Sequence, residues 1–334
     1  MATTESTIGT THRSPVPSPR PSLTSSLGDG RKTRRSCKLC GSVSLERLYR
    51  NHNKHSPTSP LTTARCKHCG LVFVQDQISE TEATLAYTTL DHHNYYAEIA
   101  ETNNAKLNSS AHDLLRHVEP SAPIIDIGTG DGCFLGVLRS YGFVHLSAHD
   151  IPGTDLSALE SQGIKTYKDV DLTSVPSNTF AAATLLDVAE HVVEPRCLFE
   201  QCYRILTDVG LLYFHTPVIS LLDEAMQGLH CIPLLRRVGA VWQKGRTNIF
   251  HLQNYTPNAI RLVLSKVGFV NIKIRVCNEL SWPIERYIRA HLCENQGMPE
   301  ILTPLVTAAL RPFLTSNLVN RNKAVVVAWK RRTL

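Results

Sequence analysis

The chain has 334 residues, of which 42% are hydrophobic, and a formal net charge of +6. This is enough apolar material for one sizeable domain and a small accessory one. No apolar run approaches the roughly 20 residues that a membrane-spanning helix needs, and the N-terminus lacks the apolar stretch of a secretory signal, so we expect neither feature.

The positive charge is concentrated near the N-terminus. Residues 1–36 carry +4 and residues 37–75 carry +5, whereas residues 76–329 carry −6. Six of the ten cysteines are scattered singly, which is typical of reduced thiols in a cytoplasmic protein. We therefore expect a cytoplasmic protein with a mildly acidic body, and the oligomeric state stays open.

The first 34 residues are rich in Ser, Thr, Pro and Arg and contain few large apolar side chains. Such a segment cannot bury enough surface to offset the entropy lost on ordering. We expect residues 1–34 to be a disordered tail. Their shortage of acids also suits an organellar transit peptide, but no amphipathic arginine-bearing helix is evident.

Two copies of a Cys-x-x-Cys-Gly pattern follow the tail. The first contains Cys37 and Cys40, the second contains Cys66 and Cys69, and 25 residues separate them. Two such turns complete a tetrahedral four-cysteine site, so residues 35–75 predict a zinc ribbon. Four thiolates leave zinc no open position, which makes the predicted site structural rather than catalytic. The alternative is a pair of redox dithiols.

The rest of the chain alternates between β-rich and helical segments. Residues 76–118 look helical and form a linker or lid, with Tyr95 and Tyr96 as candidate pocket residues or simple packing residues. From 119 to 334 we expect a Rossmann-like α/β domain, a doubly wound and mostly parallel seven-stranded sheet, with helical cover insertions at 217–248 and 278–322. The candidate strands are residues 123–128, 144–150, 164–169, 180–188, 210–216, 269–276 and 324–330. The candidate helices are residues 132–141, 155–162, 195–206 and 257–267.

A glycine loop stands between the first of these strands and its helix. The strand ends on Asp126 and is followed by Gly128, Gly130 and Gly132. Glycines let the backbone pass close to a ligand, and the following helix N-terminus offers unpaired N–H groups. A dinucleotide fingerprint would place its third glycine at position 133, which is a cysteine, and no Gly-Lys-Ser/Thr of a P-loop follows.

The segment DIGTGDGCF resembles motif I of class I S-adenosylmethionine-dependent methyltransferases. In that family the glycine-loop residues hold the cofactor, and the acid that ends the second strand, here Asp150, binds the two ribose hydroxyls. The resemblance also puts Asp169 beside the adenine and Asp187 near the methionine end of the cofactor. Taken singly, each of these acids could instead cap a strand or a loop.

The segment FAAATLLDVAEHVVEP (180–195) resembles a second motif of the same family, and the combined likeness covers roughly residues 105–275. Two departures, Ala181 in place of an aspartate and Asp208-Val209-Gly210 in place of Pro-Gly-Gly, lie away from the expected cofactor contacts. The segment 249–269 resembles one found in zinc-ribbon sugar C-methyltransferases and related small-molecule methyltransferases. Those sugar enzymes usually have Glu-His where this chain has Phe250-His251.

Two histidines are candidates for the catalytic base that removes a proton from the acceptor. His191 follows the fourth strand of the predicted sheet, and His251 lies in the segment 249–269. The alternatives are that His191, with Glu190, stabilises its loop and that His251 caps the helix begun by Thr256-Pro257. His215 lies in a predicted core strand, so we expect it to be structural.

These features predict an enzyme that transfers a methyl group from S-adenosylmethionine to O or C of a small-molecule acceptor. A first alternative is an RNA base methyltransferase that grips RNA through the basic ribbon, although the catalytic body is acidic and aromatic side chains do not alternate with basic ones. A second alternative is a non-catalytic, zinc-organised interaction module. The intact glycine loop and Asp150 argue against it.

Overall fold

The computed structural model describes residues 32–51, 60–88, 92–234, 247, 249–280, 282–294 and 298–332. The predicted disordered tail lies outside these residues except for its last three positions, and so does the part of the first predicted cover insertion from 235 to 246. The side chains of Tyr95 and Tyr96 are not described either, which leaves the lid prediction untested.

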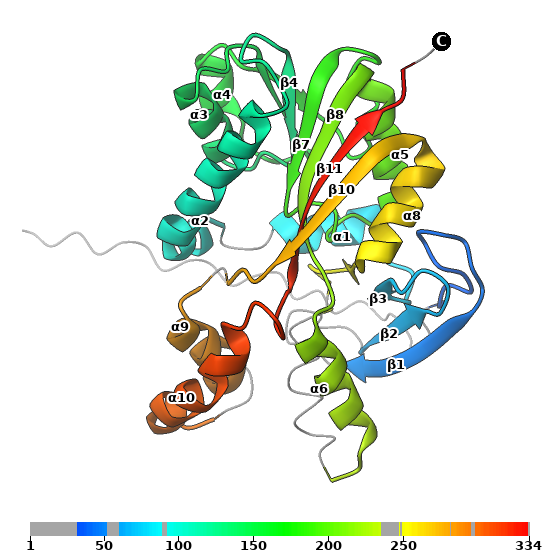
Figure 1. Cartoon of the computed structure of the whole chain (residues 1–334), viewed down its shortest axis with the longest axis vertical. Helices are drawn as coiled ribbons and strands as arrows, with labels where there is room; N and C mark the ends of the chain where they lie inside the picture. Colours follow the sequence, from blue (N-terminus) through cyan, green and yellow to red (C-terminus); the bar gives the residue numbers. More distant parts are fainter. Residues whose placement is uncertain are drawn as a thin grey trace, which may run out of the picture. The chain divides into compact units, whose positions relative to one another are not determined.

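The body of the protein is a seven-stranded sheet in the order β10-β11-β8-β7-β4-β5-β6 (Figure 1). Strands β4, β5, β6, β7 and β8 are parallel, and β11 pairs antiparallel with both β8 and β10. The strands are β4 (Ile124–Ile127), β5 (Leu146–Asp150), β6 (Lys165–Lys168), β7 (Phe180–Leu186), β8 (Leu206–Pro217), β10 (Phe269–Cys277) and β11 (Lys323–Lys330). All seven predicted strands are present, which confirms the predicted fold class.

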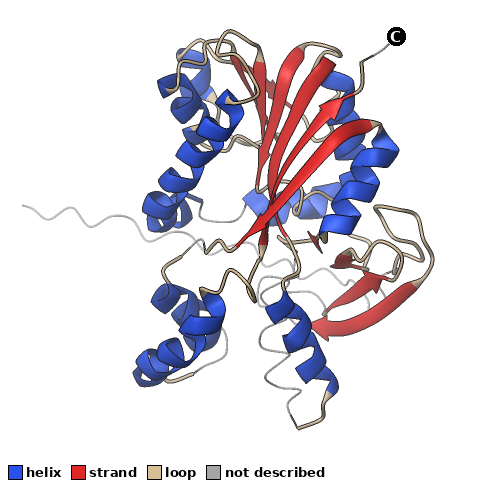
Figure 2. Cartoon of the chain, viewed as in Figure 1, coloured by secondary structure: helices blue, strands red, loops and turns tan. Residues whose placement is uncertain are grey.

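Helices cover both faces of this sheet (Figure 2). One buried cluster joins β4 and β5 to α2 (His92–Leu115), α3 (Cys133–Ser140) and α4 (Ser157–Ser161). A second cluster joins the opposite face to α5 (Pro195–Ile205) and α8 (Pro257–Val267). Each helix presents an apolar stripe to the sheet, as expected for a doubly wound α/β domain.

The cysteine segment forms a second, antiparallel sheet in the order β1-β2-β3-β9. Its first three strands, β1 (Leu45–Asn51), β2 (Leu61–Cys66) and β3 (Val72–Val74), come from the N-terminal part of the chain, and α1 (Glu80–Thr88) follows them. The fourth strand, β9 (Gln253–Asn254), comes from the segment before α8. The body of the protein therefore supplies one strand of the small sheet.

Short helices stand beyond the carboxyl end of β8 and around the end of β10. They are α6 (Leu221–Cys231), α9 (Ile284–Ile288), η1 (Arg289–Glu294), η2 (Glu300–Leu302) and α10 (Thr303–Leu314). Leu222, Ile284, Ile288 and Leu314 form the buried centre of this group. These helices fall in the two segments that the sequence predicts as a helical cover.

Candidate functional site

The glycine loop joins β4 to α3, and its backbone requires glycine. Gly128, Gly130 and Gly132 have φ values of +69°, +56° and +79°, in the left-handed region that residues with a Cβ rarely adopt. A Cβ on Gly128 would lie 2.6 Å from Cγ2 of Val188, and one on Gly132 would lie 2.4 Å from Cδ2 of Leu159. Backbone conformation and space both exclude a larger residue at these two positions.

Asp150 ends β5 and holds the glycine loop directly. Its Oδ2 accepts a hydrogen bond from the Gly130 N–H at 2.7 Å, and its Oδ1 accepts from the Ile151 N–H at 2.7 Å and from the Thr154 hydroxyl at 3.0 Å. A carboxylate offers about four lone-pair positions, and three of them are used here. Asp150, which the family resemblance assigns to the ribose of the cofactor, thus lies against the glycine loop. Its carboxylate can accept a hydrogen bond from one further donor.

Asp126 turns toward the neighbouring strand. The Thr184 hydroxyl on β7 donates to Asp126 Oδ1 at 2.6 Å, and the carboxyl is buried. Burial raises the pKa of Asp126 to about 7, although the Thr184 hydrogen bond opposes the shift. This geometry ties β4 to β7, and it matches the strand-capping alternative for Asp126 as well as a role beside the cofactor.

Asp169 organises the loop after β6. Its Oδ2 accepts from the Ser174 N–H at 2.8 Å, and its Oδ1 accepts from the Leu172 N–H at 2.5 Å and lies 3.1 Å from Nε2 of His149. Burial raises the pKa of Asp169, but the hydrogen bonds from Ser174 and His149 outweigh it and hold that pKa below its usual value. Both oxygens therefore fix the loop, and the predicted contact with adenine stays a prediction.

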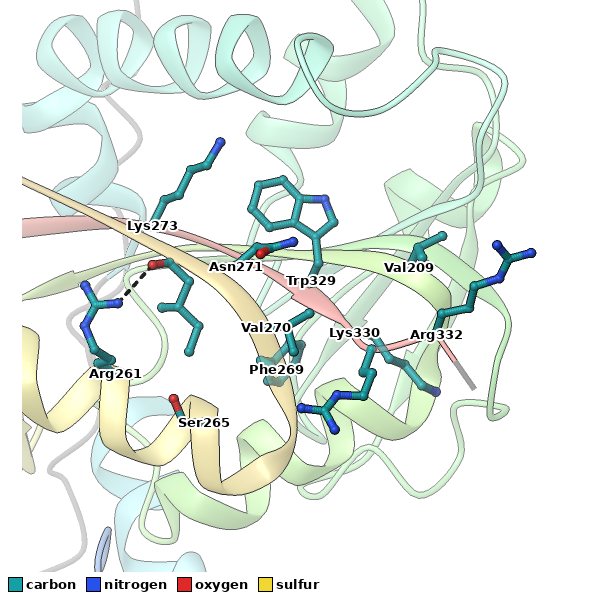
Figure 3. A pocket seen from close by; sticks show the side chains of 12 residues that line it. Val209, Arg261, Ser265, Phe269, Val270, Asn271, Lys273, Trp329, Lys330 and Arg332 are labelled. Carbon is teal, nitrogen blue, oxygen red and sulfur yellow. Dashed lines mark hydrogen bonds between the residues drawn. The ribbon is translucent and has the colours of Figure 1, made fainter. Parts of the chain in front are cut away.

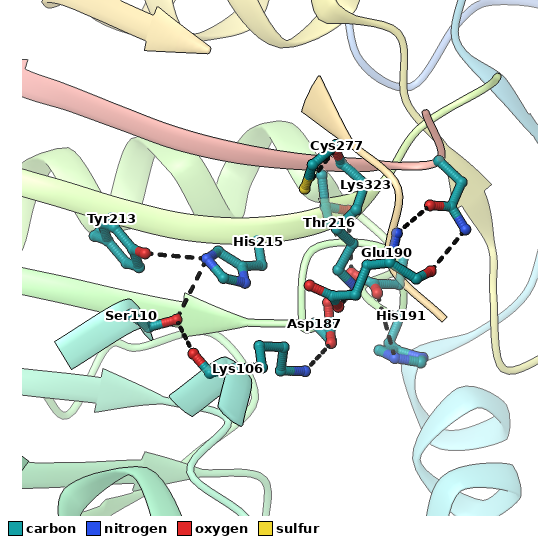
Figure 4. Close-up of polar contacts among 12 residues, drawn as sticks. Lys106, Ser110, Asp187, Glu190, His191, Tyr213, His215, Thr216, Cys277 and Lys323 are labelled. Atoms are coloured by element: carbon teal, nitrogen blue, oxygen red, sulfur yellow. Dashed lines mark hydrogen bonds and ion pairs between the residues drawn. The ribbon is translucent and has the colours of Figure 1, made fainter. Parts of the chain in front are cut away.

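Asp187 follows β7 in a left-handed conformation, with φ of +60°, and pairs with two lysines (Figure 4). Its Oδ2 lies 2.7 Å from Nζ of Lys106 on α2, and its Oδ1 contacts Nζ of Lys323 on β11. Glu279 also approaches Lys323, at 3.7 Å. Burial raises the pKa of Asp187, but the two ammonium groups hold it well below the usual range.

Neither lysine is recognisable from the sequence as part of this site. Lys106 and Lys323 lie 81 and 136 positions from Asp187, and neither belongs to a motif. Lys323 precedes the apolar run of β11, where it reads as an ordinary strand-end charge. Only its burial, at 7% exposed, distinguishes it from a surface lysine.

Glu190, His191 and His251 meet at the carboxyl end of β7. One ligand atom from each side chain lies within 4.8 Å of the other two. Nδ1 of His191 donates to the Phe250 carbonyl oxygen at 2.6 Å, and the rings of His191 and His251 have centroids 4.9 Å apart. Glu190 is 1% exposed, and burial raises its pKa to about 8.

The surroundings of Thr256 and His215 bear on the structural roles considered for His251 and His215. Thr256 is the N-cap of α8, since its hydroxyl accepts from the Ala259 N–H at 3.1 Å, and the alternative of His251 as a packing residue next to this helix stays untested. His215 is buried on β8, where its Nε2 lies 3.1 Å from the Tyr213 hydroxyl, and burial lowers its pKa to about 3. This environment fits the structural role expected for His215.

The four cysteines of the ribbon converge. Sγ of Cys37 lies 3.7 Å from that of Cys69, and Sγ of Cys40 lies 3.6 Å from that of Cys66. Tetrahedral zinc with bonds of about 2.3 Å separates its sulfurs by about 3.8 Å, so the spacing fits this metal. The glycines that follow each pair, Gly41 and Gly70, have φ values of +81° and +82°, as the tight turns require.

A separate pocket of about 830 Å³ lies at the opposite end of the strands (Figure 3). Its lining includes Phe269 at the start of β10 and Trp329 near the end of β11. Because β11 is antiparallel to β8, this is the amino end of the parallel strands. The pocket is rich in basic side chains, namely Arg261, Lys273, Lys330, Arg331 and Arg332.

Within the described residues, no helix is both long and apolar enough to cross a membrane. No curated protein sequence matches this chain significantly. Residues 96–274, more than half of the chain, match a family model described as a methyltransferase domain.

Solved structures are similar to this chain at low sequence identity. Phosphoethanolamine N-methyltransferase 2 of Haemonchus contortus, in complex with S-adenosyl-L-methionine, is 14% identical with a TM-score of 0.44, over 67% of this chain but only 52% of that one. A SAM-dependent methyltransferase of Archaeoglobus fulgidus is 16% identical, with a TM-score of 0.43 over 68% of this chain and 94% of that one. A chain from the complex with the Haloferax volcanii Trm112 methyltransferase activator is 13% identical, with a TM-score of 0.48 over 72% and 97%.

The family match over residues 96–274 contains the glycine loop, Asp150 and the segment from Asp187 to His251. The chain therefore belongs to the methyltransferase-domain family.

Proposed function

We propose that the enzyme transfers the methyl group of S-adenosylmethionine to O or C of a small-molecule acceptor. The cofactor supplies an electrophilic methyl group on a sulfonium. The protein must align the acceptor with that methyl, exclude water and manage the acceptor's proton. The roles assigned below to single residues are part of this proposal.

The observation that carries the cofactor half is the hydrogen bond between Asp150 and the Gly130 N–H. It brings a carboxylate to the bare backbone of the loop, where a nucleoside sugar needs an acceptor for its hydroxyls. In the proposal, Gly128, Gly130 and Gly132 make room for the cofactor and Asp150 binds its ribose. The proposal also places three further aspartates around the cofactor, at the ends of β4, β6 and β7: Asp126, Asp169 and Asp187.

The acceptor half of the proposal is the cluster at the end of β7. Ligands of open parallel sheets bind outside the carboxyl ends of the strands, where Asp187, Glu190 and His191 all lie. A proton acceptor at this point suits an acceptor whose hydroxyl or acidic C–H must lose a proton before it attacks. The sequence-based prediction that His191 or His251 is the base stays a prediction.

The ribbon supports an acceptor-side role because it holds the segment that carries His251. The Val74 N–H of β3 donates to the Leu252 carbonyl at 2.9 Å, and β3 pairs with β9 immediately afterwards. The Thr256 hydroxyl donates to the Cys69 carbonyl at 3.0 Å. We propose that structural zinc in the ribbon fixes this segment. The thiolate set favours a reducing compartment, so the cytoplasm stays the predicted location.

A second candidate acceptor is RNA. The exposed Arg47 and Lys67 of the ribbon, together with the basic pocket of Figure 3, favour a polyanion. The pocket lies at the amino end of the strands, away from the acceptor cluster, which makes RNA the less favoured candidate.

Calorimetry with adenosylhomocysteine tests the cofactor half. The wild-type chain is expected to bind it, and Asp150→Asn is expected to bind about 30-fold more weakly because a charged hydrogen-bond acceptor is lost. The exposed Asp155→Asn is the matched control. No binding by the wild type, or equal binding by wild type and Asp150→Asn, would contradict the assignment.

Labelled cofactor and a cell extract divided into RNA and small-molecule fractions test the acceptor half. We expect label in the small-molecule fraction. Label in the RNA fraction, with binding that weakens steeply as salt rises, would replace the small-molecule proposal by the RNA one.

A further inference from the structure

We propose that Glu190, His191 and His251 form a binding site for one divalent transition-metal ion, separate from the four-cysteine site. The three side chains bring one carboxylate oxygen and two imidazole nitrogens within 4.8 Å of one another. Two nitrogens and one oxygen suit Mn²⁺, Fe²⁺, Co²⁺ or Zn²⁺ better than they suit Mg²⁺ or Ca²⁺, which prefer oxygen ligands.

The hydrogen bonds around the cluster orient two of its three ligands. Oε2 of Glu190 accepts from the Thr216 hydroxyl at 3.1 Å, which leaves Oε1 on the side of His191, 4.0 Å from its Nε2. Nδ1 of His191 carries the ring proton, because it donates to the Phe250 carbonyl. The lone pair of that ring therefore belongs to Nε2, on the side of Glu190. Histidines that bind metals ordinarily donate their other ring N–H in this way.

The backbone holds the third ligand against the other two. The Leu252 N–H donates to the Glu190 carbonyl at 2.8 Å. The side-chain amide of Gln253 donates to the Ala189 carbonyl at 2.6 Å and to the Val192 carbonyl at 2.9 Å. These bonds tie the residues after His251 to the loop that carries Glu190 and His191. Hydrogen bonds from residues 252–253 to the loop 189–192 thus hold His251 close to Glu190 and His191.

The three ligand atoms are already close to the spacing that a bound metal ion needs. Three atoms no more than 4.8 Å apart all lie within about 2.8 Å of one common point, and metal–nitrogen or metal–oxygen bonds measure about 2.0–2.2 Å. Small side-chain rotations close this difference. Three protein ligands also leave open positions on the metal, unlike the four thiolates of the ribbon.

The donor groups at this point suit a cation. The carboxyl groups of Asp187 and Glu279 pair with the ammonium groups of Lys106 and Lys323, and the buried Glu190 adds a third carboxyl group. Both lysines contact Asp187 and one also approaches Glu279, whereas Glu190 accepts from the Thr216 hydroxyl and has its Oε1 4.0 Å from Nε2 of His191. A buried carboxyl group beside two imidazole rings is a donor set that a cation stabilises.

This inference adds a metal ion to the proposed function. The role of that metal ion in methyl transfer rests on the proposed function. An oxygen of the acceptor would take an open position on the metal, which lowers the pKa of its O–H and releases the proton to water. The oxygen, or the carbon of the corresponding enolate, then bonds to the methyl carbon as the sulfur–methyl bond breaks. Adenosylhomocysteine, one proton and the methylated acceptor are the products. The acceptor class is accordingly a molecule that offers a metal-binding oxygen.

Manganese titration followed by electron paramagnetic resonance tests the site in the full, zinc-loaded chain without cofactor. Mn²⁺ prefers oxygen and nitrogen ligands to thiolates, so it reports on this cluster and not on the ribbon. We expect one Mn²⁺ per wild-type chain. Loss of one ligand in His251→Gln or His191→Gln should weaken binding at least about 100-fold, whereas His68→Gln, at an exposed histidine of the ribbon, should leave it unchanged.

Absence of bound Mn²⁺ in the wild type, or equal binding by wild type and both variants, overturns the site. Adenosylhomocysteine calorimetry on the same samples separates the two proposals. Normal nucleoside binding with no manganese site would sink the metal inference alone. A manganese site in a chain that does not bind adenosylhomocysteine would keep the metal inference and sink the proposed cofactor site.

Discussion

The acids at the carboxyl ends of the strands fall into two groups that are held differently. On the β4–β5–β6 side, Asp150 and Asp169 are held mostly by backbone N–H groups and hydroxyls close to them in the sequence. On the β7–β8–β11 side, Asp187 is held by lysines from α2 and β11, far away in the chain. The first group is built by its own loops, while the second exists only when distant elements are packed together. The proposed cofactor side, with Asp150 and Asp169, should therefore tolerate damage that destroys the proposed acceptor side, with Asp187.

Loss of the zinc proposed for the ribbon should separate the two sides most sharply. The ribbon contributes the sheet that β9 completes next to His251, and it does not supply the glycine loop. We expect Cys66→Ser to lose the metal and metal-binding free energy on the order of 10 kcal/mol, with methyl transfer abolished and adenosylhomocysteine binding retained. Metal analysis, differential scanning calorimetry and isothermal titration measure the three quantities.

The exposed Cys197 provides the control for this change, since it lies outside the ribbon. Cys197→Ser should keep the metal content and the melting temperature of the wild type. A Cys66→Ser protein that melts and reacts like the wild type would show that the ribbon does not support the acceptor side.

Removing one lysine should destabilise the acceptor side without touching the ribbon. Lys323→Met leaves the Asp187 carboxylate without one of its two cations, and breaking a buried pair costs about 3–5 kcal/mol. We expect the lower end of this range, because a quarter of the Asp187 side chain remains exposed. Urea unfolding measures the change, and Asp187→Asn in the same chain should recover part of it.

Arg311 and Glu285 form the matched control, as an ion pair with both side chains more than half exposed. Arg311→Met should change the free energy of unfolding by less than about 1 kcal/mol. Equal losses for Lys323→Met and Arg311→Met would mean that the acceptor side does not depend on its long-range pairs.

The pH dependence of stability tests the cofactor side. Burial raises the pKa of Asp126 to about 7 in the folded chain, from its ordinary value of 3.8. Between these values the folded state keeps a proton that the unfolded state has lost, so this group's stabilisation is complete below about pH 4 and disappears as the pH rises through 7. Asp126→Asn keeps an acceptor for Thr184 and has no such loss.

The stability of Asp126→Asn relative to the wild type should accordingly rise from pH 5 to pH 8, by up to about 3 kcal/mol. Urea unfolding at both pH values measures it, with the exposed Glu119→Gln as the control. If the difference in unfolding free energy between the two proteins stays constant with pH, Asp126 titrates like an ordinary carboxyl. Burial would then not raise its pKa.

Much of this protein could be predicted from local sequence. The two Cys-x-x-Cys-Gly turns specify the converging thiols, because each turn is closed by residues within it. The glycine pattern specifies the loop, since its three residues adopt left-handed conformations. Apolar runs that alternate with helical segments specify the seven strands, and the structure reproduces them within a few residues at each end.

Other features depend on which segments pack together, and no pattern in the chain states that. Lys106 and Lys323 have no local signal, yet they decide the charge around Asp187. Residues 253–254 belong to the body by sequence position but complete the ribbon's sheet. The sequence by itself thus determined the strands, the glycine loop and the cysteine site, because short-range geometry and hydrophobic period fix them. Only the tertiary structure decided that Glu190, His191 and His251 share one point in space, because their convergence depends on packing between segments about 60 residues apart.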